Sequence, residues 1–189
     1  MDARAVSVTP AEAEALRGWV ERERATRTIE IGLGYGVSAR AVCEGLGDDA
    51  RHVAIDPFQE TRFAGRGLRL LEDAGFAPLV ELHPEESQIV LPRLLAEGRR
   101  FDLAFVDGNH RFDGVFLDLV YLGRLIRGGG VVFLDDYQLP AVARAVSFCT
   151  TNLGWTLEEV SPPDELHQWA VVRTPAAPPE RRFDHFVDF

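Results

Sequence analysis

The stretch that decides the fold is Thr28–Ser38, which reads TIEIGLGYGVS. An apolar strand runs into a turn with glycine at positions 32, 34 and 36, and a helix begins directly afterwards. Glycine at such a turn permits positive φ and lets the backbone approach a ligand closely. The spacing is GxGxG, which differs from the GxGxxG of a dinucleotide cradle and counts against NAD. The stretch predicts a strand–turn–helix unit, either with a ligand at the turn or as a glycine-rich turn that holds none.

Short apolar runs alternate with helical patterns along the rest of the chain. Strands are expected at Thr28–Ile31, His52–Ile55, Leu79–Leu82, Leu103–Val106 and Val131–Leu134. Helices are expected between them, at Val37–Leu46, Arg62–Ala74, Ser87–Glu97 and Phe112–Ile126. Alternation at this spacing predicts a parallel sheet with helices on both faces.

The two ends of the chain extend this pattern. Thr9 followed by Pro10 predicts a capped helix ahead of the first strand, with Glu12 three residues after the cap. After the fifth strand, a helix at about 141–152 precedes two apolar runs that predict an antiparallel hairpin. The expected fold is therefore α/β, with a mostly parallel seven-stranded sheet that ends in an antiparallel hairpin.

A single globular domain is expected within the 189 residues. It covers residues 28–174, with an N-terminal helix or cap at 1–27 and a Pro- and Phe-containing tail at 175–189.

Composition excludes several classes of protein. All 20 basic side chains are arginine, and the absence of lysine excludes a lysine Schiff base and a P-loop that depends on its lysine. The net charge of −10 argues against binding to a nucleic-acid backbone. Cys43 and Cys149 lie far apart and form no disulfide framework or zinc motif. The start has no apolar leader and no run approaches a membrane span, so we expect a cytoplasmic soluble protein without a membrane partner.

Acidic residues accompany the first two expected strands. Glu30 lies inside the strand that leads into the glycine turn, where a carboxylate is costly unless something pairs with it, and a cationic ligand would do so. Asp56 ends the second strand, a position that suits hydrogen bonding to ribose hydroxyls or a helix cap. Together with the glycine turn, Asp56 favours a nucleoside ligand.

Three more carboxylates follow later strands. Asp107 ends one strand, and the pair Asp135–Asp136 ends the next. Ligand sites in open α/β sheets lie beyond the carboxyl ends of the strands, so we expect these acids to be neighbours. Their oxygen atoms suit Mg²⁺ or a similar hard cation. Alternatively, Asp136 caps the following helix and Asp107 holds its own turn.

His110 stands beside this acidic cluster. A neutral imidazole there can accept a proton near pH 7, or it can be a structural group bonded to a carboxylate. His52 and His83 are expected to be structural, and His167 carries no signal of its own.

With these residues in place, the chain resembles the class I S-adenosylmethionine-dependent methyltransferases. Within them it is similar to the metal-dependent small-molecule O-methyltransferases of the catechol and caffeoyl-CoA type and their bacterial natural-product relatives. The resemblance spans about Thr28 to Arg173. It rests on Glu30–Gly36 (EIGLGYG), Ile55-Asp56-Pro57, Glu86-Ser87-Gln88 with the following Leu91–Leu94, Asp107, and Asp135-Asp136.

The resemblance implies a Rossmann-like methyltransferase fold and a set of site residues. It implies that Gly32, Gly34 and Gly36 pass beneath the methionine part of S-adenosyl-L-methionine, with Asp56 on the ribose and with Ser87 and Gln88 near the adenine. We include Glu30, Ser38 and Asp107 among the expected cofactor-binding residues, because an acid-lined mouth suits the cationic sulfonium. Asp107, Asp135 and Asp136 match the metal-ligand positions.

Two positions depart from related enzymes. His110 stands where catechol-type enzymes use a lysine base, and Asn109 stands where related sugar O-methyltransferases have an aspartate. His110 and Asn109 are therefore the candidate catalytic residues.

The expected function is methyl transfer from S-adenosylmethionine to a hydroxyl of a small molecule, assisted by Mg²⁺ or a similar divalent cation. The alternatives are a metal-independent methyltransferase, an NAD-dependent oxidoreductase and a non-catalytic cofactor-binding subunit. The expected partner is the small-molecule acceptor, without nucleic acid, and the short N-terminal cap is compatible with a homodimer.

Overall fold

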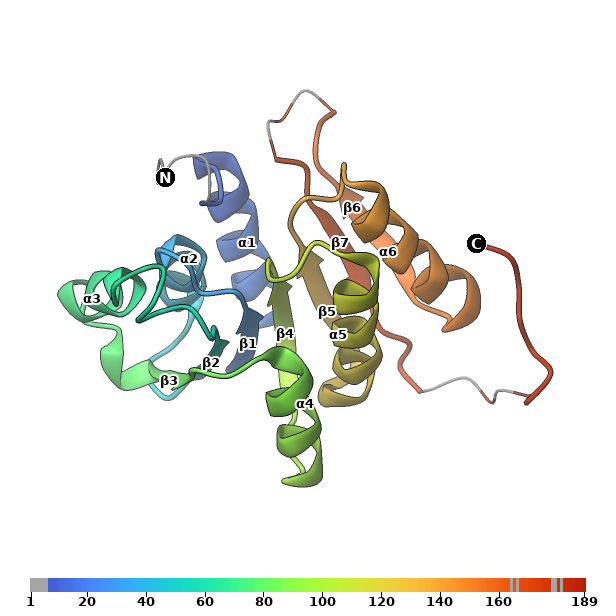
Figure 1. Ribbon diagram of the computed structural model, residues 1–189, viewed down its shortest axis with the longest axis horizontal. Helices are drawn as coiled ribbons and strands as arrows, with labels where there is room; N and C mark the ends of the chain where they lie inside the picture. The colour runs from blue at the N-terminus through green and yellow to red at the C-terminus, as the bar shows by residue number, and fades with distance from the viewer. Residues whose placement is uncertain (1–6, 164, 166, 178–179, 181) are drawn as a thin grey trace.

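The strand runs predicted from the sequence form the centre of one seven-stranded sheet in the order β3-β2-β1-β4-β5-β7-β6 (Figure 1). The computed structural model describes residues 7–163, 165, 167–177, 180 and 182–189. The strands are β1 (Arg27–Ile31), β2 (Arg51–Ile55), β3 (Val80–His83), β4 (Phe101–Val106), β5 (Ile126–Leu134), β6 (Thr156–Val160) and β7 (Ala170–Arg173). β1 to β5 are parallel, whereas β7 runs antiparallel between β5 and β6.

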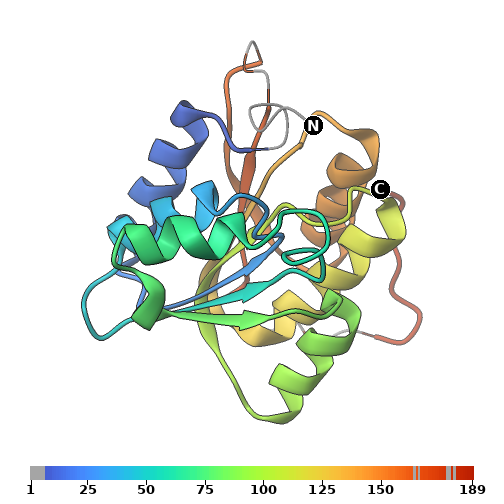
Figure 2. The same ribbon diagram turned by 60° about the vertical axis from the view of Figure 1, so that its left-hand side comes forward.

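Helices cover both faces of the sheet, as Figure 2 shows. α1 (Pro10–Glu23), α2 (Val37–Gly45) and α3 (Arg66–Asp73) lie on one face. α4 (Ser87–Ala96), α5 (Phe112–Leu125) and α6 (Pro140–Asn152) lie on the other, and a short 3₁₀ helix, η2 (Ala77–Leu79), precedes β3. The larger core packs α4, α5 and α6 against the sheet, and a second core lies under α1 and α2. The expected α/β fold, with its mostly parallel sheet and terminal hairpin, is confirmed.

Several predicted boundaries differ from the observed ones. β5 begins at Ile126 and not at Val131, and β4 begins at Phe101 and not at Leu103. Two further differences have local reasons. The third helix begins at Arg66 and not at Arg62, because residues 58–65 form turns in which the Phe58 carbonyl accepts hydrogen bonds from Arg62 N and Phe63 N. Leu79 belongs to η2, so β3 begins one residue later than predicted. The N-cap of α1 is confirmed, since Thr9 Oγ1 accepts a hydrogen bond from Glu12 N at 3.2 Å.

The last described residues of the chain follow α6 (Figure 1). The buried side chain of Asn152 binds the backbone of Val187 twice: its Nδ2 donates to the Val187 carbonyl at 2.8 Å, and its Oδ1 accepts from Val187 N at 2.8 Å. The ring of Phe189 packs edge-on against Phe148 of α6. Two hydrogen bonds and a ring contact therefore fix this end of the chain to α6.

Among the described residues, no helix combines the length and the apolar character needed to cross a bilayer.

Asn152→Ala should release the segment around Val187 from α6. Both hydrogen bonds are lost while the backbone of Val187 regains water, so we expect the free energy of unfolding to fall by about 1–2 kcal/mol. Faster proteolytic cleavage after Thr174 should accompany this loss. Thr151→Ala, at an exposed position of the same helix, is the matched control and should change neither measurement. Unchanged protection of the segment in Asn152→Ala would contradict this account.

Candidate functional site

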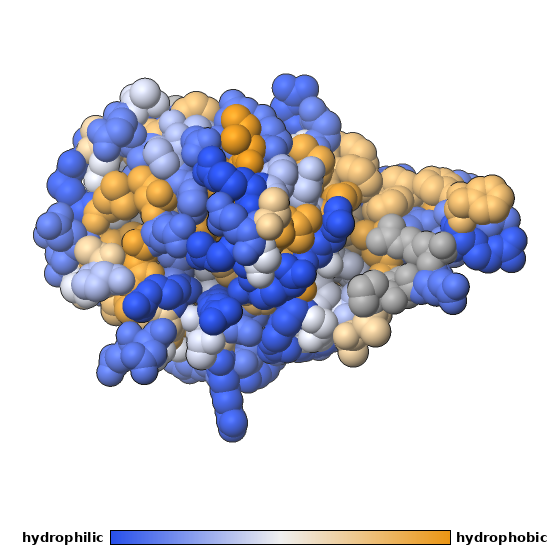
Figure 3. Space-filling view, turned by 90° about the horizontal axis from the view of Figure 1, so that it is seen from below, coloured by the Kyte–Doolittle hydropathy of each residue, from blue (hydrophilic) through white to orange (hydrophobic). Residues whose placement is uncertain are grey.

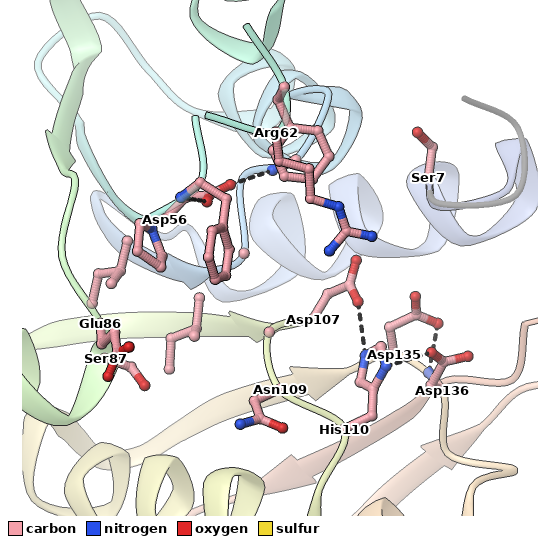
Figure 4. Close-up of a pocket in the computed structure, with 18 of the residues that line it drawn as sticks. Ser7, Asp56, Arg62, Glu86, Ser87, Asp107, Asn109, His110, Asp135 and Asp136 are labelled. Carbon is pink, nitrogen blue, oxygen red and sulfur yellow. Dashed lines mark hydrogen bonds and ion pairs between the residues drawn. The ribbon is translucent and has the colours of Figure 1, made fainter. Parts of the chain in front are cut away.

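A cavity of about 650 Å³ opens at the carboxyl ends of the parallel strands (Figure 4). It is lined by the ends of β1, β2, β4 and β5, by the start of α4 and by the loop after β2. Its lining residues include Ile31, Gly32, Gly34, Asp56, Pro57, Phe58, Arg62, Phe63, Glu86, Ser87, Gln88, Asp107, Asn109, His110, Asp135, Asp136 and His167. The cavity lies where the sequence predicted a site, because parallel strands bring their carboxyl ends to one edge of the sheet.

The glycine turn passes close to the end of β4. Gly32 has φ +95, and a Cβ atom there would lie 2.0 Å from the carbonyl oxygen of Asp107. Gly36 has φ +81, and a Cβ atom there would lie 2.7 Å from the carbonyl oxygen of Gly67. The turn therefore needs glycine at these positions for both its backbone conformation and its packing.

A buried polar network lies behind this turn. Ser38 Oγ donates to Glu30 Oε2 at 3.0 Å, and His52 Nε2 lies 3.2 Å from Glu30 Oε1. His52 Nδ1 and Thr28 Oγ1 are 2.9 Å apart. All of these side chains are buried. The protein itself provides a hydrogen bond to Glu30 Oε2, whereas Oε1 has the imidazole of His52 beside it but no hydrogen bond among the described residues.

Some of the expected cofactor-binding residues of the first strand and turn line the cavity, and others do not. Gly32 and Gly34 line the cavity. Glu30, Gly36 and Ser38 are not among its described lining residues. Their role in binding a cofactor stays a prediction, and their observed role is to hold the turn.

Asp56 joins the loops that follow β1 and β2. Its Oδ2 accepts hydrogen bonds from Gly34 N and Gln59 Nε2, each at 2.8 Å, and its Oδ1 accepts from Phe58 N at 2.7 Å. A carboxylate has about four acceptor sites, so three bonds leave capacity for a ligand in the cavity. Asp56 therefore fixes the shape of the turn and still faces the space where a ribose is expected.

The start of α4 lines the cavity through Glu86, Ser87 and Gln88, and Gln88 Nε2 donates to Glu86 Oε2. Behind Ser87 stands Asp118 of α5, which is only 1% exposed. Burial raises the pKa of Asp118 from 3.8 to about 6, against the opposing effect of the Ser87 hydroxyl. Asp118 was not singled out in the sequence, since an acid among apolar helix positions gives no signal of its partner.

The predicted acidic cluster is assembled at the ends of β4 and β5 (Figure 4). His110 lies between two of the acids: its Nε2 is 3.1 Å from Asp107 Oδ1, and its Nδ1 is 3.3 Å from Asp136 Oδ2. Asp135 is 4% exposed, and its Oδ1 accepts a hydrogen bond from Asp136 N at 2.6 Å. Asp136 has φ +55, a conformation that is uncommon outside glycine and occurs at functional sites.

The structural alternatives for these aspartates are not observed. Asp136 does not cap α6, whose N-cap is Leu139 without a side-chain hydrogen bond. The side chain that holds the turn after β4 is that of Asn109, whose Oδ1 accepts from Arg111 N at 3.0 Å. The carboxylate of Asp107 is directed to His110 instead.

Burial and crowding raise the pKa values of acids in this site. Burial, followed by the charges of Asp107 and Asp136, raises the pKa of Asp135 to about 7. Burial also raises the pKa of Asp107, although His110 opposes the rise. The hydrogen bond to Asp107 raises the pKa of His110 above 6.5. Burial and mutual repulsion thus make ionisation of these acids more costly than that of exposed carboxyl groups.

Two residues of this cluster were missed by the sequence analysis. His167, in the loop between β6 and β7, places its Nδ1 3.3 Å from Asp136 Oδ1. Glu12 of α1 is fully buried, and burial together with Asp135 raises the pKa of Glu12 to about 10. In the sequence, Glu12 stands three residues after an N-cap, and this motif gives it a local role. The motif does not indicate the contact of Glu12 with Asp135.

The donor atoms of this cluster suit a divalent cation. Two sets, Asp107–His110–Asp136 and Asp135–Asp136–His167, each bring their ligand atoms within 4.8 Å of one another. Carboxylate oxygens suit Mg²⁺, Mn²⁺ and Ca²⁺, while imidazole nitrogens also suit Mn²⁺, Co²⁺ and Zn²⁺. Asp136 belongs to both sets, whereas Asp107 belongs only to the first and Asp135 only to the second. The three aspartates predicted as ligands therefore do not form one set by themselves, and each set includes a histidine.

The fold and this site together define a Rossmann-like methyltransferase domain. The model of a family described as "Methyltransferase domain" matches residues 29–137, which is more than half of the chain. The chain belongs to this family.

Curated relatives and solved structures agree with this assignment. The chain is 33% identical to tricin synthase 2 of Oryza sativa subsp. japonica over 135 residues, which are 69% of this chain and 44% of the relative. It is 26% identical to the caffeoyl-CoA O-methyltransferase of Stellaria longipes over 160 residues, which are 78% of this chain and 66% of the relative. The chain thus spans about half to two thirds of the length of these relatives.

Among solved structures, the O-methyltransferase TomG from Streptomyces achromogenes, solved in complex with SAM, has a TM-score of 0.77 at 24% identity. That likeness covers 90% of this chain and 82% of TomG. The resemblance to class I S-adenosylmethionine-dependent O-methyltransferases is confirmed.

The raised pKa of Asp118 predicts how stability depends on pH. The pKa of Asp118 is about 6 in the folded protein, above the ordinary 3.8. Ionisation of Asp118 therefore does not lower the free energy of unfolding below pH 3.8, and it lowers that free energy by the full amount above pH 6. A shift of about two units corresponds to roughly 3 kcal/mol. Asp118→Asn should therefore be more stable than wild type at pH 8 by up to this amount, with no gain at pH 4, in denaturant titrations.

Asp113→Asn is the matched control, because Asp113 lies on the same helix with a side chain that is 75% exposed. It should leave the pH dependence unchanged. An equal gain for Asp118→Asn at both pH values would refute the ionisation argument.

Proposed function

We propose that this chain transfers a methyl group from S-adenosylmethionine to a hydroxyl group of a small molecule, with help from a divalent cation. One observation carries the proposal: a single cavity joins the glycine turn and Asp56 to the carboxylates of Asp107, Asp135 and Asp136. Membership of the methyltransferase domain family supports the transfer chemistry. The printed names of the relatives, tricin synthase and caffeoyl-CoA O-methyltransferase, support a hydroxyl acceptor.

The residues near the glycine turn suit the methyl donor. The free acceptor capacity of Asp56 matches a ribose diol, and Ser87 and Gln88 provide polar contacts for a base farther along the cavity. The carboxylate of Asp107 would stabilise the positive charge of a sulfonium bound nearby. Phe58 and Phe63, from the loop after β2, close the apolar side of the cavity.

In this proposal Asp107, Asp135 and Asp136 hold the divalent cation, with His167 beside them. When bound, the cation supplies positive charge that favours ionisation of the acceptor hydroxyl. The raised pKa values of Asp107 and Asp135 support this assignment, since they mark negative charge without a sufficient counter-charge.

His110 is the proposed proton acceptor, through its Nε2 atom. Its pKa is raised as long as Asp107 is free to accept its hydrogen bond. A cation held by that carboxylate would oppose this rise, which would favour the neutral imidazole that a proton acceptor needs. Alignment of the acceptor oxygen with the methyl carbon supplies most of the remaining acceleration.

The proposed acceptor is defined by its chemical class. It is a small molecule with a free hydroxyl group, such as a catechol, a sugar or a polyketide phenol. The net charge of −10 disfavours nucleic acid as acceptor. A homodimer is also part of the proposal, supported by exposed aromatic side chains such as Phe183 and Phe186.

The function is tested by calorimetric titration with S-adenosylmethionine and NAD in parallel, followed by methyl-transfer assays on a panel of hydroxyl acceptors. We expect S-adenosylmethionine to bind and NAD not to bind. Methyl transfer should stop after chelation of divalent cations and return when Mg²⁺ or Mn²⁺ is added. Asp135→Asn should lose the metal dependence together with most turnover. Binding of NAD alone would reject the proposal, and undiminished transfer after chelation would leave a metal-independent enzyme. Donor binding without any transfer across the panel would favour a cofactor-binding subunit.

His110→Ala tests the proton acceptor separately. Loss of a general base typically costs about 10²–10⁴-fold in rate, so kcat should fall by that factor while S-adenosylhomocysteine binds unchanged. His185→Ala, in the segment after Thr174, is the matched control and should keep full activity. Turnover of His110→Ala equal to wild type would remove this residue from the mechanism.

A further inference from the structure

A second cavity, of about 290 Å³, lies at the opposite end of the sheet. It is lined by Arg27, Arg51, Arg99, Arg100 and Phe101. We call it the arginine pocket. Arg27 and Arg51 begin β1 and β2, whereas the methyltransferase cavity starts where these strands end. With about 3.3 Å per residue, β1 separates the two cavities by roughly 13 Å.

Strand register forces these arginines together. β1 lies between β2 and β4, and Arg27 is paired directly with Arg51 in the parallel ladder. Neighbouring strands are about 4.8 Å apart, and like charges directly opposite one another repel. Arg99 and Arg100 enter from the other side, immediately before β4. Figure 3, which views the molecule from this end, shows strongly hydrophilic side chains gathered across its middle.

Most of this positive charge has no counter-charge in the protein. Arg99 pairs with Glu81 at 2.9 Å. Within the part of the chain that the structure describes, no carboxylate pairs with the guanidinium of Arg27, Arg51 or Arg100. The chain carries 30 acidic side chains and a net charge of −10, so three unpaired arginines in one hollow are unexpected.

A further acid beside the arginine pocket is already occupied. Asp102, which follows Phe101, accepts hydrogen bonds from Thr26 N and Arg27 N through Oδ2 and pairs with Arg127 through Oδ1 at 3.1 Å. These bonds tie the starts of β1 and β4 together and leave the side chain of Arg27 directed elsewhere. The arginine pocket therefore presents fixed positive charge on a backbone that Asp102 holds in place.

We propose that the arginine pocket binds a small anion with two or more phosphoryl groups. Planar guanidinium groups bind phosphate oxygens through paired hydrogen bonds, and several of them around one hollow match the several charges of a diphosphate or triphosphate. A single carboxylate would leave most of the charge unpaired. The site lies away from the methyl-transfer cavity, so this ligand is neither the methyl donor nor the acceptor.

The test is calorimetric titration of the metal-free protein with pyrophosphate and with triphosphate at low ionic strength. We expect binding that weakens as salt rises, because the site is open to solvent. Arg27→Gln combined with Arg51→Gln should weaken binding about 100-fold, which is about tenfold for each guanidinium removed. Arg40→Gln combined with Arg182→Gln removes the same charge from residues paired with Glu44 and Asp184, and it should bind as wild type does.

Three results would overturn the proposal. The first is absence of binding at millimolar pyrophosphate, and the second is equal weakening in the two double variants, which would indicate a general charge effect. The third is equally tight binding of an oligoglutamate peptide, which would assign the surface to an acidic protein partner. Because Arg27 and Arg51 are exposed, both double variants should keep the wild-type thermal midpoint, and this check separates lost binding from lost folding.

Discussion

Repulsion among crowded carboxylates makes the acids at the carboxyl ends of β4 and β5 harder to ionise. Glu12, Asp107, Asp135 and Asp136 reach the same small volume from α1, β4 and β5. Nothing in the geometry of a parallel sheet requires such a concentration of acids, and each of them is more expensive to ionise because of the others. The two imidazoles of His110 and His167 offset part of this cost. Burial and this crowding raise the pKa values of Glu12, Asp107 and Asp135, so these acids hold protons more readily than exposed carboxyl groups do.

The sequence predicted the elements that depend on local pattern. The apolar runs Leu103–Val106 in β4 and Val131–Leu134 in β5 are continuous, and an acid follows each of β2, β4 and β5, so the site edge could be found without a structure. What failed depends on contacts that composition does not reveal, some of them local and some between residues distant in the sequence. The turn at 58–65 resembles a helix in composition, but backbone bonds to Phe58 close it early. His167 carries no pattern, since its place near Asp136 depends on how the β6–β7 loop folds back over the sheet.

Glu30 illustrates a different kind of limit. The cost of burying its carboxylate was foreseen, but a partner is His52, which pairs with Thr28 in the ladder, reaches Glu30 from the adjacent strand β2 and was assigned only a general structural role. A sequence shows that a buried charge needs a partner, and it does not show whether that partner is a ligand or a side chain on the adjacent strand. Similarly, the arginines at 27, 51, 99 and 100 are far apart in the chain, and only strand order brings them into one pocket.

The position of β7 has a consequence for the order of assembly. β7 is inserted antiparallel between β5 and β6, although it is the last strand in the sequence. The loop that leads into it carries His167, so the acids at the ends of β4 and β5 receive this imidazole only when the final hairpin has joined the sheet. A nascent chain that stops before residue 167 would contain the glycine turn and every predicted aspartate, but its acidic edge would lack one imidazole. The site is therefore complete only after the last strand, β7, has joined the sheet.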